Sequence, residues 1–241
     1  GKIIQAHLQC PFHGFEFDSS GKCVLIPANG VDAPLPKAMV VDSYPVQEKH
    51  GFVWMWWGEG REEYPPIRFF DSLEDRDFSY STLKDHWEAH YSRAIENQLD
   101  VIHLPFIHRT TIGRGNRTVV DGPVDEWACE VDEACNQLHI WVMNRVEDGI
   151  PARRERDLQK PDRRPFLQFQ FPNIWHNWIS DSVRVMVAFA PIDDQTTMLY
   201  LRFYQKMVQL PVLKQIVNFT GKIGNLVIER QDRWVVETQR P

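Results

Sequence analysis

The sequence has few cysteines and no long apolar run. Its 241 residues include four cysteines, too few for a disulfide scaffold, and no secretory signal opens the chain. Charged residues interrupt every apolar stretch well before the roughly 18 to 20 residues that a membrane span needs. We therefore expect a reducing, cytoplasmic setting and no membrane association.

An excess of positive charge is also lacking. Lys and Arg number 27 against 33 Asp and Glu, the net charge is −6, and there is no long basic run. This balance excludes a nucleic-acid partner. With 13 glycines, 16 prolines and 43% hydrophobic residues, the chain is neither collagen-like nor disordered, and it is long enough for one large domain or two modest ones.

Turn signals and linker composition predict two domains. The first sixty residues alternate short β-like runs with turns, which is typical of a small all-β unit. The polar stretch 59–66, with prolines at its end, is the best linker candidate. We place the domains at 1–60 and 61–241.

The second part is predicted to be an α+β domain. A helix is expected from about Asp85 to Leu104, because no Gly or Pro occurs from Trp87 through Leu104, and Pro105 should end or kink it. A helical stretch closes the chain at 211–238. This order predicts a helix-grip-like antiparallel sheet with packed helices, whose β-like runs lie at 126–131, 138–144, 166–171, 183–190 and 198–204.

The first group of residues with metal chemistry is CPFHGFEFDSSGKC, from Cys10 to Cys23. Cys10 and His13 can present sulfur and nitrogen to a small inorganic centre, and Gly14 lets the backbone approach it closely. The other three cysteines, Cys23, Cys129 and Cys135, are interpreted as buried structural residues.

This string resembles the second half of the Rieske iron–sulfur motif, with Phe12 and Phe15 in the usual aromatic positions. In a Rieske [2Fe–2S] centre two cysteines bind one iron and two histidines the other. The resemblance makes Cys10 and His13 two of these four ligands. The upstream Cys-x-His pair is missing and the chain opens with Gly1, so we expect an absent N-terminal segment.

The second group is ENQLDVIHLPFIH, from Glu96 to His108. Asp100 and His103 would share one face of a helix. The break at Pro105 lets His108 swing back toward the same point, so that two histidines could share one metal.

The string resembles the Asn-x-x-Asp-x-x-His-x-x-x-x-His motif of Rieske non-haem iron ring-hydroxylating oxygenases. Asn97, Asp100, His103 and His108 meet every fixed position. The resemblance implies catalytic roles for Asn97 and Asp100, with Asp100 bridging by hydrogen bonds between an iron-bound histidine and a Rieske histidine.

In such enzymes an acidic residue downstream completes a 2-His-1-carboxylate triad around Fe(II), leaving positions open for O2. The C-terminal segment resembles the family's Asp-x-x-x-x-x-x-Gln-x-Pro ending, which indicates Asp232. Glu229 and Glu237 are the alternatives, since charged residues on a helix are often just its solvated face.

A rival metal site lies at His86 and His90, which would sit one helical turn apart as in His-Glu-x-x-His zinc proteases. In that motif the glutamate that acts as general base directly follows the first histidine, whereas Glu88 lies one residue further along the chain. We interpret both histidines as partly exposed helical residues. No dinucleotide fingerprint appears, so NAD(P)H should bind a partner protein.

By resemblance, the chain is the catalytic α subunit of a Rieske mono- or dioxygenase that hydroxylates or oxidatively demethylates a small hydrophobic, aromatic or polycyclic substrate. Electrons should come from a ferredoxin or flavin reductase, and three subunits should form a homotrimer that brings the cluster of one chain beside the iron of the next. A hydrophobic-ligand carrier and a zinc hydrolase at His86 and His90 are the alternatives.

Overall fold

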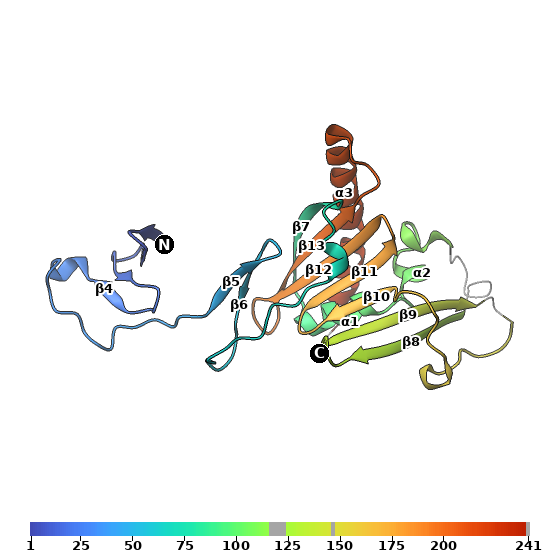
Figure 1. The fold of residues 1–241 in the computed structure, drawn as a ribbon, viewed down its shortest axis with the longest axis horizontal. Helices are drawn as coiled ribbons and strands as arrows, with labels where there is room; N and C mark the ends of the chain where they lie inside the picture. The colour runs from blue at the N-terminus through green and yellow to red at the C-terminus, as the bar shows by residue number, and fades with distance from the viewer. Residues whose placement is uncertain (116–123, 146–147, 240–241) are drawn as a thin grey trace. The chain divides into compact units, whose positions relative to one another are not determined.

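The computed structural model of the chain describes residues 1–115, 124–145 and 148–239 (Figure 1). The chain divides into two compact units, Gly1–Ile67 and Arg68–Pro241. The stretch 59–66 has no helix or strand and lies just before this division. The two units are described separately.

The first unit is built from short antiparallel strands. One sheet has four strands in sequence order, and a separate hairpin has two. Gly21, at φ +83°, turns the chain where a Cβ atom would overlap the carbonyl oxygen of Val41. The expected all-β character is confirmed, with β1 (Lys2–Ile4), β2 (His7–Gln9), β3 (Glu16–Phe17), β4 (Cys23–Leu25), β5 (Val46–Lys49) and β6 (Phe52–Met55).

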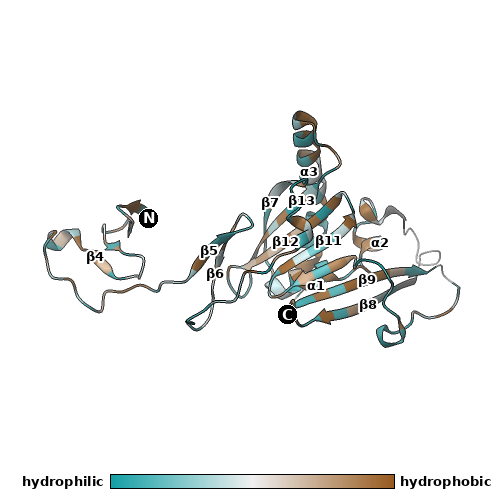
Figure 2. Ribbon diagram, viewed as in Figure 1, coloured by the Kyte–Doolittle hydropathy of each residue, from teal (hydrophilic) through white to brown (hydrophobic). Residues whose placement is uncertain are grey.

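The second unit is a seven-stranded antiparallel sheet with helices against it. Figure 2 shows that both polar and apolar residues occur along β8 and β9. The α+β expectation is confirmed. In spatial order the strands are β7 (Ser79–Trp87), β13 (Thr197–Gln205), β12 (Val183–Pro191), β11 (Ile174–Ser180), β10 (Leu167–Gln170), β9 (Gln137–Arg145) and β8 (Val124–Asp132).

Helices α1 (Tyr91–Leu99) and α3 (Pro211–Val236) cover one face of this sheet. Alternate strand residues point toward them: Leu199, Leu201 and Phe203 of β13 belong to the buried core. A Cβ at Gly221 would overlap the ring of Phe203, so the glycine lets α3 approach the sheet closely. The core therefore lies between the sheet and the helices.

The prediction of one helix from Asp85 to Leu104 is wrong. Strand β7 extends to Trp87 because it pairs along its whole length with β13, and sheet pairing overrides local helix preference. Helix α1 starts after His90, whose side chain caps it, and ends at Leu99. Pro105 lies in the first turn of the short helix α2 (Leu104–Ile107), where a missing N–H costs little.

Two further expectations can be compared with the structure. All four cysteines lie in the described part of the chain and are free thiols. Cys23 is buried as expected, but Cys129 is half-buried and Cys135 is exposed in the turn after β8, so the interpretation of Cys135 as a buried residue is wrong. Among the described residues, none of the helices has both the length and the apolarity needed to cross a bilayer.

Candidate functional site

Two histidines and an aspartate converge in the second unit. Oδ1 of Asp232 lies 2.9 Å from Nε2 of His108 and 3.3 Å from Nε2 of His103. One ligand atom from each residue lies within 4.8 Å of the other two. Asp232 and His108 are buried, and His103 is partly buried. The structure thus brings together three residues far apart in the sequence.

A short helix and a close backbone contact position the two histidines. His103 directly precedes α2 and His108 directly follows it, with ring centroids 5.2 Å apart. The amide of Gly113 donates to the carbonyl of His108 at 2.9 Å. A Cβ at Gly113 would overlap the carbonyl oxygen of Leu104, so only glycine lets this segment pack against α2.

The second nitrogen of each imidazole is held by a neighbouring side chain. Nδ1 of His103 donates to Oδ2 of Asp100 at 3.2 Å, and Nδ1 of His108 donates to Oε1 of Gln231 at 2.8 Å. The hydroxyl of Thr111 donates to the same Oε1 at 2.9 Å. Both Nε2 atoms are therefore turned toward Asp232, the orientation that outer hydrogen bonds impose on ligating histidines.

Sequence reasoning placed Asp100 and His103 on one helix, and this is wrong in detail. Asp100 is the extended residue after α1, and His103 lies beyond the turn that follows it. Gln231 was not predicted as a site residue. Its only signal in the sequence is its place beside Asp232.

Electrostatics favour a cation between the three side chains. Burial raises the pKa of Asp232, but His103 and His108 outweigh this and hold it below its usual value. Burial lowers the pKa of His103, whereas Asp100 and Asp232 outweigh burial and raise it to about 9. Without a metal, a proton on His103 would supply the positive charge that the carboxylates attract.

The donor set fits a divalent first-row metal. Despite the short distances to both rings, Oδ1 of Asp232 has no hydrogen-bond partner of acceptable geometry in the described part of the chain. The two imidazole Nε2 atoms and Oδ1 of Asp232 face one point without well-formed hydrogen bonds to one another, which is the arrangement expected of metal ligands. Two imidazoles and one carboxylate form the set that non-haem iron sites use.

The other two acidic candidates are placed differently. Glu229 is buried one turn before Asp232 and lines the adjoining cavity, but it is outside the group of three ligand atoms. Glu237 accepts from Nε of Arg233 at 2.8 Å and from the amide of Glu88 at 2.8 Å. Its contacts therefore tie the end of α3 to the chain before α1.

His86 and His90 do not share a helix face. His86 is exposed on strand β7, and His90 is the residue before α1, with its Nδ1 atom 2.9 Å from the hydroxyl of Ser92. The interpretation of both as helical residues is wrong. The one-turn spacing of the zinc-protease motif is therefore lost.

Cys10 and His13 lie on the turn between β2 and β3 of the first unit. The amide of Cys10 donates to Phe15 at 2.8 Å and the amide of Gly14 to Cys10 at 3.0 Å, which closes the turn. His13 is exposed and Cys10 is half-buried. Among the described residues these two supply only half of the donors that a Rieske centre needs.

A cavity of about 110 Å³ adjoins His103, His108 and Asp232. The segment from α1 to α2 forms one wall, α3 forms another, and the sheet supplies the third with Leu167, Trp175 and Val185. Asn97 also lines it, and its Nδ2 atom is buried without a hydrogen-bond partner in the described residues. A small, largely apolar ligand fits these walls.

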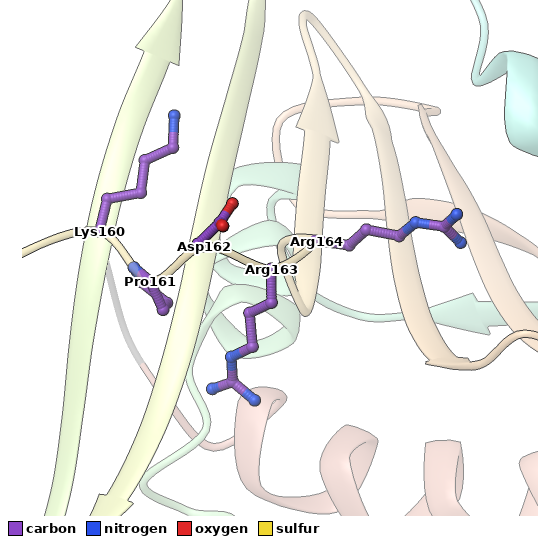
Figure 3. A pocket seen from close by; sticks show the side chains of 5 residues that line it. All are labelled: Lys160, Pro161, Asp162, Arg163 and Arg164. Atoms are coloured by element: carbon purple, nitrogen blue, oxygen red, sulfur yellow. The ribbon is translucent and has the colours of Figure 1, made fainter.

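A second hollow, about 560 Å³ and open to solvent, is formed by the loop Lys160–Arg164 (Figure 3). Its three cationic side chains point in different directions. Lys160 is paired with Glu130 at 2.6 Å and Arg164 with Asp181 at 3.1 Å. Charges that are already partnered and do not converge make this loop a poor ligand site.

Two protein-family models match the chain. The Rieske [2Fe-2S] domain matches residues 1–45, and the vanillate O-demethylase oxygenase C-terminal domain matches residues 87–241. The second match covers more than half of the chain, and it includes His103, His108 and Asp232.

Three individual proteins illustrate the similarity. Protein TIC 55, chloroplastic, from Pisum sativum is 28% identical over 183 residues, which cover 73% of this chain and 29% of that protein. The oxygenase component of dicamba O-demethylase from Stenotrophomonas maltophilia is 33% identical over 111 residues, 45% of this chain and 32% of that protein. The crystal structure of dicamba monooxygenase bound to dicamba shares the fold, with a TM-score of 0.69 at 18% identity over 98% of this chain and 70% of that one.

These similarities have a defined extent. The chain spans about a third of the length of these curated relatives. Several relatives carry names that mark them as one component of a multicomponent system, such as an oxygenase component or an iron-sulfur subunit.

Proposed function

Because the chain belongs to the Rieske non-haem iron oxygenases, we propose that His103, His108 and Asp232 hold the mononuclear Fe(II) of such an enzyme. The observation that carries this proposal is the outer hydrogen bond on each imidazole, which leaves both Nε2 atoms facing Asp232. Fe(II) bound there would supply the activation of O2. The chain's own residues orient the ligands and shape the cavity beside them.

The proposed reaction is hydroxylation or oxidative demethylation of a small aromatic substrate held in the cavity. The apolar walls from the sheet and α3 support an apolar ring beside the proposed metal site. A volume of about 110 Å³ favours a single ring over a polycyclic system. Neither a hydrophobic-ligand carrier nor a zinc hydrolase is favoured by the family matches.

Cys10 and His13 are proposed as one half of the ligand set of a [2Fe–2S] cluster. Their place on one closed turn and the match of residues 1–45 to the Rieske domain support this role. Residues 1–60 would then form the cluster domain and 61–241 the iron domain, and the division after Ile67 supports a boundary in this region. No catalytic step is derived through the cluster.

Asp100 is proposed to connect the two metal centres. Its Oδ2 atom contacts His103, while the side chain remains almost half exposed and so can accept a second contact. In a homotrimer this second contact would be a cluster histidine of the next subunit, with electrons supplied by a ferredoxin or flavin reductase. Asn97, on the last turn of α1 and at the cavity, is proposed to position substrate. A cytoplasmic location stays a prediction, because three relatives are named as chloroplastic.

Metal analysis of three carboxyl variants tests the iron site. Asp232→Ala should lose the mononuclear iron, because a site with three protein ligands is left with two. Glu229→Gln on the same helix and Glu237→Gln just beyond its end are the controls and should retain it. Thermal unfolding of each variant checks that the fold is intact. Iron that is unchanged in Asp232→Ala and lost in Glu229→Gln would refute the assignment.

A further inference from the structure

Polar atoms without a hydrogen-bond partner gather around the cavity beside the proposed iron site. Within the described part of the chain, four lining residues besides Asp232 each have one such buried atom. A buried polar group without a partner destabilises the folded protein unless a ligand or solvent molecule satisfies it. These atoms are Nδ2 of Asn97, Nε1 of Trp175, Oδ1 of Asn177 and Oε2 of Glu229.

Two of these residues are neighbours on one face of strand β11. Trp175, Asn177 and Ile179 all line the cavity, whereas the intervening His176 and Trp178 are absent from its walls. Residues two apart on a strand lie roughly 6.5 Å from each other. The indole N–H of Trp175 and the amide of Asn177 can therefore contact one substituent of a bound ring.

The chemistry of this pair specifies the substituent. An indole N–H can only donate a hydrogen bond, whereas an amide can donate or accept. A hydroxyl group matches both residues at once, because its oxygen accepts from Trp175 and its hydrogen is donated to Oδ1 of Asn177. A methyl group of the same size would leave both polar atoms unpaired.

The charges around the cavity disfavour an anion. The described lining residues include the carboxyl groups of Asp100, Glu229 and Asp232 and contain no Lys or Arg. Burial, followed by repulsion from Asp232 and Asp85, raises the pKa of Glu229 well above its usual value. A carboxylate on the ring would lie among these acidic groups with no Lys or Arg to pair with it, and the ring of His103 is already paired with Asp100 and Asp232.

We propose that Trp175 and Asn177 select neutral, single-ring substrates that carry a hydroxyl group. At about 110 Å³ the cavity is smaller than the engineered apolar cavity of about 150 Å³ that accepts one benzene molecule, so its size limits a ligand to one ring at most. The inference rests on the proposed function for what happens to the ring. The selection itself is a property of binding and can be measured without turnover.

The test compares three ring compounds of similar size in anaerobic calorimetric titrations of the Fe(II)-loaded protein at pH 7. They are 4-methoxyphenol, 4-methoxytoluene and 4-methoxybenzoate. The phenol should bind at least about tenfold more tightly than the toluene, because the toluene leaves buried polar groups unpaired. The benzoate should be weaker than the phenol by a similar factor, about tenfold.

Variants on β11 then locate the selection. Trp175→Phe and Asn177→Leu should each lower the affinity for the phenol to nearly that for the toluene and leave the toluene affinity unchanged. Two independent variants keep the test intact if one of them fails to fold. Trp178→Phe is the matched control on the same strand, and it should keep the wild-type preference.

Several outcomes would overturn the inference. For the wild-type protein, these are equal affinity for the phenol and the toluene, no binding of any of the three compounds, or a benzoate that binds as tightly as the phenol. For the variants, the contradicting result is a preference for the phenol over the toluene that survives in both Trp175→Phe and Asn177→Leu. The proposed function fails separately, through the metal analysis of Asp232→Ala. Phenol selection by the wild-type protein, together with an Asp232→Ala variant whose iron content is unchanged, would refute that function and support the selection.

Discussion

Gln231 should control the metal affinity of the site although it is not a proposed ligand. Its Oε1 atom accepts from Nδ1 of His108 at 2.8 Å, and this bond leaves Nε2 free to face Asp232. The hydroxyl of Thr111 donates to the same oxygen, so the acceptor is itself held in place. Gln231→Leu keeps the volume and removes the acceptor, which frees the imidazole to rotate.

The expected loss follows from the burial of the ring. Outer hydrogen bonds to ligating histidines are typically worth about 10- to 100-fold in metal affinity. His108 is only 1% exposed, so water cannot replace the lost acceptor. We therefore expect a loss near the upper limit, about 100-fold, or about 2.7 kcal/mol at 25 °C.

Anaerobic titration with Fe(II) against a competing chromogenic chelator measures this affinity. Gln231→Glu keeps an acceptor oxygen and should bind Fe(II) nearly as tightly as the wild type. Gln215→Leu makes the same chemical change at an exposed position of α3 and should have no effect. If Gln231→Leu binds Fe(II) as tightly as Gln215→Leu, the contact does not orient His108 and the reasoning is refuted.

Three further predictions concern the site and the fold. Gly113→Ala should weaken Fe(II) binding, measured by the same titration, because its Cβ overlaps the backbone of α2; unchanged affinity would show that α2 adapts without cost. Asp100→Asn should retain iron, since the amide oxygen can still accept from His103, while product formation with a reductase falls sharply; normal turnover would exclude the connecting role. Hydrogen bonds from Arg153 lower the pKa of the buried Glu126 to about 2, so this carboxylate stabilises the fold above its ordinary pKa of 4.5 and loses that contribution as the pH falls toward 2. Urea unfolding between pH 5 and pH 2 should therefore be less dependent on pH in Glu126→Gln than in the wild type, and identical slopes would contradict the assignment.

Local sequence was sufficient to identify the types of donor in the site. The string from Glu96 to His108 and the acidic C-terminal segment indicated two histidines and one carboxylate, because ligand chemistry depends on residue type and short spacing. The α+β organisation was also predictable, since strand and helix periodicities are local properties of the chain.

The local geometry of the donors was not predictable to the same degree. The chain from Asp85 to Trp87 reads as helix in isolation, but pairing with β13 makes it a strand. The turn between Asp100 and His103 depends on where α1 ends, and that end is set by packing against the sheet and α3. Long-range contacts of this kind contribute more free energy than local propensity and so override it.

The resemblance of the C-terminal ending indicated Asp232, but only the tertiary structure shows which of the three acidic residues near the C-terminus faces the histidines. Glu229, Asp232 and Glu237 lie on or just beyond one helix, and nothing in their spacing says which of them faces α2. The packing of α3 on the sheet, with Gly221 against Phe203, sets the rotation of the helix, and this rotation turns Asp232 toward the histidines. The contact of Gln231 with His108 also depends on the tertiary structure, and so do the unpaired polar atoms of β11. Both result from the packing of segments more than 50 residues apart, and local sequence patterns do not reveal such distances.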